Sequence, residues 1–181
     1  MADGLQDGGI VIGVGAMAIG RKRGGHLVTY ALGSCVGVSA YDPITRVGGI
    51  LHFMLPSRPA ASAGTDSDPF LYATTGIPAM FDVLAAAGAQ KQRLVVCAAG
   101  GAEILVDAGA FRIGQRNRDI VRKILAKAAI AIAAEDLGGK AARTMTLDLS
   151  TGVVKIRTGG TERVLWAAPN KTLLAPLGTK P

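Results

Sequence analysis

Hydrophobic and polar residues are arranged along this chain in a pattern that predicts many short strands and two helices. Continuous or alternating apolar runs predict strands at residues 10–19, 26–32, 36–41, 47–54, 93–98, 130–134, 144–149, 153–157 and 162–166. Apolar positions at helical spacing predict one helix within 70–87 and a second over 114–127. The run 130–134 also fits a helix tail, but its Ile-Ala-Ile alternation favours a strand. Mixed elements with several hairpins are typical of an α+β fold, here a layered α/β sandwich with mixed, hairpin-rich sheets and flanking helices.

Turn residues separate these elements. Asp42-Pro43-Ile44-Thr45 favours a tight turn between two strands, because Asp suits the first turn position and Pro presets φ at the second. Ser150-Thr151-Gly152 joins another predicted hairpin. A polar loop over 56–69 is long for a compact domain. We expect one domain over residues 1–168 and a loose C-terminal tail over 169–181.

The composition favours a cytoplasmic protein without a metal or another cofactor. The two cysteines make no disulfide framework, and no Cys/His set has the spacing of metal ligands. Gly13, Gly15 and Gly20 lack the G-x-G-x-x-G spacing of a dinucleotide site. No apolar run reaches about 18 residues, and no basic region followed by an apolar segment opens the chain. We therefore expect no membrane insertion and a cytoplasmic location.

The net charge of +7 suits either nucleic acid or an acidic protein as a partner, and the placement of the basic residues bears on the choice. The basic residues are scattered, and no aromatic residues lie between them to stack nucleic-acid bases. This pattern favours a solvated basic surface, or a docking face for an acidic protein, over nucleic-acid binding.

The hairpin around Pro43 brings one of the cysteines close to a histidine. If the turn is centred between Pro43 and Ile44, with two or four loop residues, Cys35 lies directly opposite His52. Opposed residues in an antiparallel pair have Cβ atoms about 4.5–5.5 Å apart, within reach of a thiol and an imidazole. A loop of three or five residues would instead place them on opposite faces of the sheet.

A thiol beside an imidazole predicts nucleophilic chemistry. The thiolate is the reactive form, and an adjacent His commonly activates it. Thr29, on the preceding strand, is a candidate to accept the imidazole N–H and so to orient His52. Gly33 permits a tight turn before Cys35, where free backbone N–H groups would form an oxyanion hole. The alternative stays open, because a Cys or His in an apolar run more often belongs to the core, and we expect Cys97 to be a core residue.

Several short motifs also occur together in this chain. They are Leu-Gly-Ser-Cys at 32–35, Tyr-Asp-Pro at 41–43, His-Phe-Met-Leu-Pro at 52–56, Gly-Gly-Ala at 100–102, Ile-Gly-Gln-Arg-Asn at 113–117, Ala-Glu-Asp-Leu-Gly-Gly at 134–139, Arg143 and Ser-Thr-Gly at 150–152. In this order they resemble the CheD family of chemoreceptor glutamine deamidases, over roughly residues 10 to 160. The resemblance implies a cysteine hydrolase on a layered α/β sandwich similar to that of glutamine-deamidating toxins.

The resemblance further implies a role for each of three residues. By motif, Cys35 is the nucleophile, His52 is the base and Thr29 orients His52. The implied reaction hydrolyses glutamine side-chain amides to glutamate, with loss of ammonia and a thioester on the cysteine. The expected substrates are the cytoplasmic helices of chemoreceptors. A phosphatase of the CheC type is the further partner that the resemblance suggests.

The strand before Gly100 departs from the family pattern. Family members commonly have Lys and Phe where this chain has Cys97-Ala98-Ala99, a difference that bears on docking and not on the three site residues. A regulatory binding module for a CheC-type phosphatase, with weak or vestigial catalysis, therefore remains the alternative function. A cysteine hydrolase outside chemotaxis is a third interpretation.

Overall fold

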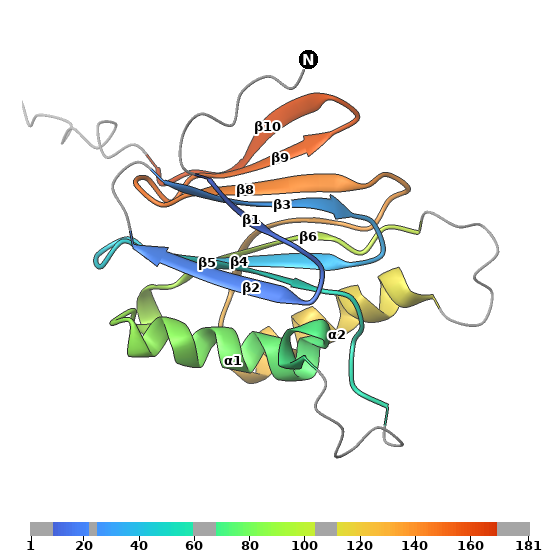
Figure 1. Cartoon of the computed structure of the whole chain (residues 1–181), viewed down its shortest axis with the longest axis horizontal. Coiled ribbons are helices and arrows are strands. Elements are labelled where there is room, and N and C mark those ends of the chain that lie inside the picture. Colours follow the sequence, from blue (N-terminus) through green and yellow to red (C-terminus); the bar gives the residue numbers. More distant parts are fainter. Residues whose placement is uncertain (1–8, 22–24, 60–67, 104–111, 170–181) are drawn as a thin grey trace, which may run out of the picture.

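The structure, a computed structural model, describes residues 9–21, 25–59, 68–103 and 112–169. It has three layers: one five-stranded sheet, a second five-stranded sheet, and two helices that cover the free face of the second sheet (Figure 1). The first sheet has the order β1 (Ile10–Ile12), β3 (His26–Leu32), β8 (Arg143–Asp148), β9 (Val154–Thr158) and β10 (Thr161–Trp166). The second has the order β2 (Ala16–Arg21), β5 (Val47–Phe53), β4 (Val36–Asp42), β6 (Val95–Gly100) and β7 (Ile132–Leu137). The helices are α1 (Ala73–Ala86) and α2 (Ile113–Lys127), with short 3₁₀ turns at Pro69–Leu71 and Lys91–Arg93. The predicted α+β layered sandwich is confirmed.

The second sheet is buried on both faces because it lies between the helices and the first sheet. Every residue of β4 and β5 is buried, which explains why these segments read as continuous apolar runs. Successive side chains point to opposite faces, so each strand contributes to two cores. The helix-side core includes Val36, Val38, Leu51, Phe53, Ile77, Met80, Leu84, Val121 and Leu125. The core between the sheets includes Leu27, Leu32, Ile50, Cys97, Met145, Leu147 and Ile156.

The first predicted strand is wrong in one respect: residues 10–19 form two strands and not one. β1 pairs in parallel with β3, whereas β2 pairs antiparallel with β5, so the chain changes sheets between Ile12 and Ala16. Gly15 has φ +71°, a left-handed conformation that glycine adopts readily. The Ala16 N–H donates to the Gly13 carbonyl at 3.2 Å. The glycines of this apolar run therefore form the turn between the two sheets.

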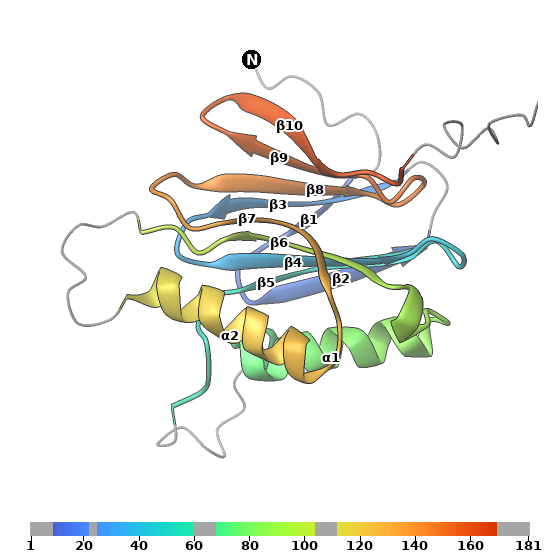
Figure 2. The ribbon, with the colours of Figure 1, turned by 180° about the vertical axis from the view of Figure 1, so that it is seen from behind.

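The other predicted elements are confirmed, with shifted ends. The ambiguous run 130–134 contributes to a strand, β7, which lies beside β6 at the edge of the second sheet (Figure 2). The strand predicted at 93–98 begins at Val95, because Lys91–Arg93 is a 3₁₀ turn. Pro78 lies inside α1. Residues 60–67 of the predicted loop and 170–181 of the predicted tail lie outside the described part of the chain.

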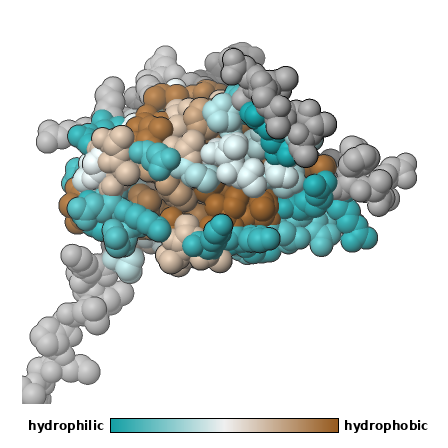
Figure 3. All heavy atoms as spheres, turned by 90° about the horizontal axis from the view of Figure 1, so that it is seen from below, coloured by the Kyte–Doolittle hydropathy of each residue, from teal (hydrophilic) through white to brown (hydrophobic). Residues whose placement is uncertain are grey.

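The helical layer forms the opposite face of the molecule from the first sheet. Seen from this side, apolar side chains show between hydrophilic ones (Figure 3). A surface pocket of about 310 Å³ lies there, lined by residues of α1, α2 and the segments beside them, among them Pro78, Phe81, Leu94 and Ile124. None of its lining residues belongs to the cysteine–histidine site predicted from the sequence.

Candidate active site

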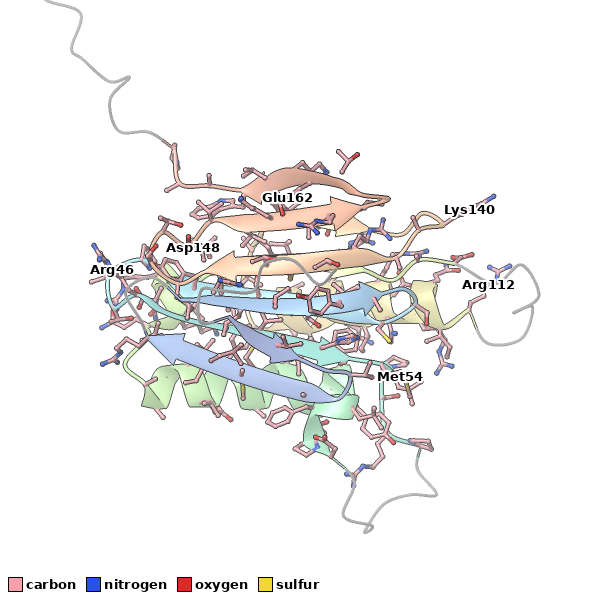
Figure 4. All side chains as sticks on the ribbon, turned by 45° about the horizontal axis from the view of Figure 1, so that its top comes forward. Arg46, Met54, Arg112, Lys140, Asp148 and Glu162 are labelled. Carbon is pink, nitrogen blue, oxygen red and sulfur yellow. The ribbon has the colours of Figure 1, made fainter. Side chains whose placement is uncertain are left out.

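The three predicted site residues lie in two neighbouring strands of different sheets and in the bend that leads from one sheet to the other. Thr29 lies in β3 of the first sheet, and His52 lies in β5 of the second sheet. Cys35 ends the bend 33–35, through which the chain passes from β3 to β4 and thus from one sheet to the other. Met54, two residues after His52, lies at one end of the molecule, whereas Arg46 in the β4–β5 turn lies at the other (Figure 4).

The direct Cys35–His52 pair predicted from the hairpin is wrong by two residues. His52 lies opposite Gly37, and Asp42 pairs with Val47, so the loop consists of the four residues 43–46. The Asp42 carboxylate explains this register: its Oδ1 accepts the N–H groups of Ile44 and Thr45, which makes Asp42 the last strand residue before the loop. A slip of two residues preserves the face to which side chains point.

Contacts along the edge of the hairpin keep Cys35 beside the strand of His52. Val36, the next residue after Cys35, pairs with Phe53. The residue before Cys35, Ser34, shares a hydrogen-bond donor with Met54: Nδ2 of Asn117 donates to the carbonyl oxygens of both, at 2.9 and 2.8 Å. The chain on each side of Cys35 is therefore tied to the chain just after His52.

Thr29 and His52 meet across the two sheets. The Thr29 Oγ1 and the His52 Nδ1 lie 2.8 Å apart, and both residues are buried. The same hydroxyl lies 2.8 Å from the Ile12 carbonyl oxygen, which can only accept. Since a hydroxyl has one proton, Thr29 donates to Ile12 and accepts from the Nδ1–H of His52. This assignment leaves Nε2 of His52 without a proton, so Nε2 can act as a base.

The environment of His52 keeps its ring neutral at pH 7. Burial lowers the pKa of His52 from 6.5 to about 4, since a charged imidazolium is poorly solvated there. Its Nε2 is buried and has no hydrogen-bond partner among the described residues. The imidazole is thus oriented at Nδ1 and able to accept a proton at Nε2.

The two cysteines have different environments. Cys35 is partly exposed, and burial raises the pKa of its thiol, an effect that its own backbone N–H opposes. Cys97 is fully buried between the sheets, and burial raises the pKa of that thiol to about 11. The prediction that Cys97 belongs to the core is confirmed, and Cys35 is the thiol that a reagent can reach. Both Cys35 and His52 are neutral before reaction, so thiolate formation requires proton transfer to a base during the attack.

The backbone around Cys35 is held by its carbonyl groups. The Gly33 carbonyl accepts the Ala102 N–H and the Cys35 carbonyl accepts the Gly101 N–H, both at 2.7 Å. The Ser34 carbonyl between them accepts from Asn117. In the described part of the chain, the N–H groups of Ser34 and Cys35 donate to no backbone carbonyl. These N–H groups are therefore the candidates in this bend for binding an oxyanion that forms beside the thiol.

A glycine is required where β6 passes the Cys35 segment. Gly100 has φ +110°, and a Cβ atom built on it would overlap the Cys35 carbonyl oxygen. Sequence reasoning gave no site role to Gly100 or to Asn117. Both lie within the motifs on which the family resemblance rests, 100–102 and 113–117, and that was the signal that could have found them.

The structure adds two further observations about the described residues. No group of three or more His, Cys, Asp or Glu side chains in this part of the chain could hold a metal ion. None of the helices described is long and apolar enough to cross a membrane.

Comparison with known proteins identifies the family. Residues 54–158 match a family model described as CheD chemotactic sensory transduction. This chain belongs to the CheD family. Its CheD relatives include the probable chemoreceptor glutamine deamidase CheD 1 of Syntrophus aciditrophicus, 40% identical over 153 residues, which are 84% of this chain and 96% of the relative. Those of Solibacter usitatus and Pyrococcus horikoshii, both named probable chemoreceptor glutamine deamidase CheD, are 40% and 41% identical over 86% and 82% of this chain, and 92% and 91% of the relatives.

One of these CheD alignments can be shown to include the candidate site, even though the family model begins after it. The alignment with the Solibacter usitatus protein spans 86% of this chain. It leaves fewer residues unmatched than the 28 that precede Thr29. Thr29, Cys35 and His52 therefore all lie within the aligned span.

Proposed function

We propose that this chain is a chemoreceptor glutamine deamidase, in which Cys35 is the nucleophile, His52 the general base and Thr29 the residue that orients His52. The observation that carries the proposal is the hydrogen bond between Thr29 and His52. It presents an unprotonated Nε2 in a segment tied to the bend of Cys35. Membership of a family whose relatives are named glutamine deamidases supports the choice of reaction.

Acylation begins when the Cys35 thiol loses its proton to Nε2 of His52. The sulfur forms a bond to the amide carbon of a glutamine side chain, and the carbonyl electron pair moves to oxygen. The N–H groups of Ser34 and Cys35 stabilise this oxyanion. The intermediate collapses when the imidazolium gives its proton to the amide nitrogen. Ammonia leaves, and a thioester links the substrate to Cys35.

Deacylation repeats the same proton transfers with water. Nε2 of His52 takes a proton from water as the oxygen attacks the thioester carbon. The carbon–sulfur bond breaks, and the imidazolium returns the proton to the thiolate of Cys35. The product is a carboxylic acid, whose proton passes through solvent to the released ammonia, so each cycle converts one amide and one water into one glutamate carboxylate and one ammonium ion.

A neutral hydroxyl, that of Thr29, is sufficient to orient the imidazole of His52. This hydroxyl accepts from Nδ1–H in both the neutral and the protonated ring, so the imidazole keeps its orientation through the cycle. A hydroxyl stabilises the imidazolium less than a carboxylate would, and burial keeps the pKa of His52 low. The imidazolium is therefore a strong acid toward the leaving nitrogen, which favours expulsion of ammonia.

The test of the function is direct conversion of receptor glutamines. The purified chain is incubated with a chemoreceptor cytoplasmic fragment, and peptides are analysed by mass spectrometry for an increase of about one dalton per Gln→Glu change. Ammonia release is measured in parallel, and one ammonia per converted glutamine is expected. The control is the same protein after thiol alkylation, which we expect to be inactive. A receptor that stays unmodified by fresh enzyme, with no ammonia formed, would contradict the proposal.

The proposed substrate lies on the cytoplasmic helices of receptors, so we place the reaction in the cytoplasm. The alternative role, as a binding module for a CheC-type phosphatase, requires no oriented base. The Nε2 atom of His52 is buried without a hydrogen-bond partner among the described residues, which costs stability and serves no purpose in a binding module. We therefore favour the enzyme.

A further inference from the structure

Asn117 links the two halves of the candidate site from outside it. It lies in the second turn of α2, at the end of the molecule where Met54 and Arg112 are found (Figure 4). Its side chain is fully buried. The two protons of its Nδ2 go to the carbonyl oxygens of Ser34 at 2.9 Å and Met54 at 2.8 Å. A single amide thus holds together the residue before Cys35 and the residue two positions after His52.

The orientation of the Asn117 amide is determined by these partners. Both are carbonyl oxygens, which only accept, so the amide nitrogen and not its oxygen must face them. The remaining atom, Oδ1, is buried without a hydrogen-bond partner among the described residues. The side chain therefore uses its full capacity as a donor on the active-site backbone and leaves its acceptor unused.

Contacts of neighbouring residues hold the start of α2, and with it the Asn117 amide, in a fixed position. Gly114 packs so closely that a Cβ atom there would overlap the Ala102 carbonyl oxygen. The Arg118 guanidinium donates to the Gly101 carbonyl and pairs with Glu103. The start of α2 is therefore fixed against the segment whose N–H groups hold the carbonyls of the Cys35 bend.

We propose that Asn117 is a positioning residue of the deamidase, which sets the separation between Cys35 and His52 and directs the N–H groups of the Cys35 bend toward the oxyanion. This inference rests on the proposed function. Asn117 contacts no reacting atom, since it acts through the carbonyls of Ser34 and Met54. With those carbonyls released, the thiol and the imidazole no longer start from a fixed geometry, and a misplacement of about 1 Å can cost on the order of 10²-fold in rate.

The test compares Asn117→Ala with Val121→Ala. Val121 is one turn further along α2, is fully buried in the helix-side core, and has an aliphatic side chain that can make no hydrogen bond to the site backbone. Both variants lose buried contacts, but only Asn117→Ala loses the two hydrogen bonds to the Cys35 and His52 segments. Turnover of the receptor fragment is measured well below the thermal midpoint of each variant. We expect kcat to fall about 30- to 100-fold in Asn117→Ala, with KM changed less than about threefold, and both constants to stay within about threefold in Val121→Ala.

Each possible outcome has a distinct meaning. If the kcat of Asn117→Ala stays within about threefold of that of Val121→Ala, Asn117 is merely structural and the inference is wrong. If Asn117→Ala does not fold, the shape-matched Asn117→Asp replaces it: it retains at most one donor, and we expect kcat to fall at least about tenfold. An unconverted receptor with the unmodified chain, or full activity in Cys35→Ala, would overturn the proposed function itself and not only the role of Asn117.

Discussion

The Thr29 hydroxyl accepts the Nδ1–H of His52 across the interface between the two sheets, at 2.8 Å. This contact joins a strand of the first sheet to a strand of the second, and it fixes which ring nitrogen has the proton. The β1 strand contributes as well, because the Ile12 carbonyl accepts the hydrogen bond that the Thr29 hydroxyl donates, which leaves Thr29 as the acceptor toward His52. The packing of the two sheets therefore determines the tautomer of His52, with the proton on Nδ1 and not on Nε2.

Removing the Thr29 hydroxyl should impair the reaction without abolishing it. Thr29→Val keeps the shape but leaves the Nδ1–H without an acceptor, so the ring can take another orientation or tautomer. We expect kcat to fall on the order of 10²-fold while nucleophile and base still react. The loss of two buried hydrogen bonds should lower the free energy of unfolding by about 1–3 kcal/mol. Thr29→Ser, which keeps the hydroxyl, is the control, and equal kcat values for Thr29→Val and the unmodified chain would remove Thr29 from the site.

The stability of the fold should depend on pH through His52. The imidazole titrates near 6.5 when solvated and at about 4 in the folded protein. Between these values the unfolded chain binds more protons than the folded chain, so the free energy of unfolding falls as the pH falls from about 6.5 to about 4. The pKa shift corresponds to about 3 kcal/mol.

The variant His52→Gln isolates this effect. Carboxylates also titrate in acid, but they are common to both proteins, so the difference in stability between them reports His52 alone. Urea unfolding at several pH values from 4 to 7 supplies the measurement. We expect His52→Gln to show a shallower loss of stability toward acid. Parallel curves for the two proteins would mean that His52 is not buried as described.

The two thiols should differ in reactivity in the folded protein. A small alkylating reagent near neutral pH should modify Cys35, which is partly exposed, and leave Cys97 intact, because Cys97 is fully buried and burial raises the pKa of its thiol to about 11. Peptide mass spectrometry locates the adduct. After denaturation both residues should react. Labelling of Cys97 at the rate of Cys35 without denaturation would show that the inter-sheet core is open to reagents.

Gly100→Ala should damage the site more than its backbone strain alone would predict. The new methyl group would overlap the Cys35 carbonyl oxygen, and the residue would keep a φ of +110°. Gly159 in the β9–β10 turn is the matched control, because it also has positive φ but a Cβ atom placed there would meet no other atom within 4 Å. We expect Gly159→Ala to cost about 1–2 kcal/mol of stability and no activity, and Gly100→Ala to reduce kcat as well. Receptor deamidation by the two folded variants decides the matter, and equal activity would show that the Cys35 carbonyl need not be held.

The site could be predicted from sequence as far as it depends on local patterning. Alternation along β4 and β5 predicted that Cys35 and His52 face the same side, and an error of two residues in register does not reverse that prediction, because two is the strand period. The register itself depends only in part on local contacts. Besides the N–H groups of Ile44 and Thr45, the Asp42 carboxylate accepts the distant Gln90 N–H at 2.9 Å and forms an ion pair with Arg93, and these partners could not be read from the hairpin sequence.

Two other features could not be predicted from the sequence, because they too depend on partners far away in the chain. The apolar run 10–19 contains no polar break, so nothing in it shows that the chain changes sheets, a choice made by pairing with β3 and β5. Asn117 looks like an ordinary polar residue of an amphipathic helix. Its partners, Ser34 and Met54, lie 83 and 63 residues earlier in the chain, and only the folded structure brings them to one amide.

The central claim is that Cys35 is the nucleophile of a glutamine deamidase, and a comparison of Cys35→Ala with Cys97→Ala tests it most directly. Each variant is incubated with the chemoreceptor cytoplasmic fragment, and the increase of about one dalton per converted glutamine is followed by mass spectrometry. The account predicts no conversion by folded Cys35→Ala and nearly full conversion by Cys97→Ala. Conversion by Cys35→Ala at the rate of the unmodified chain would contradict it.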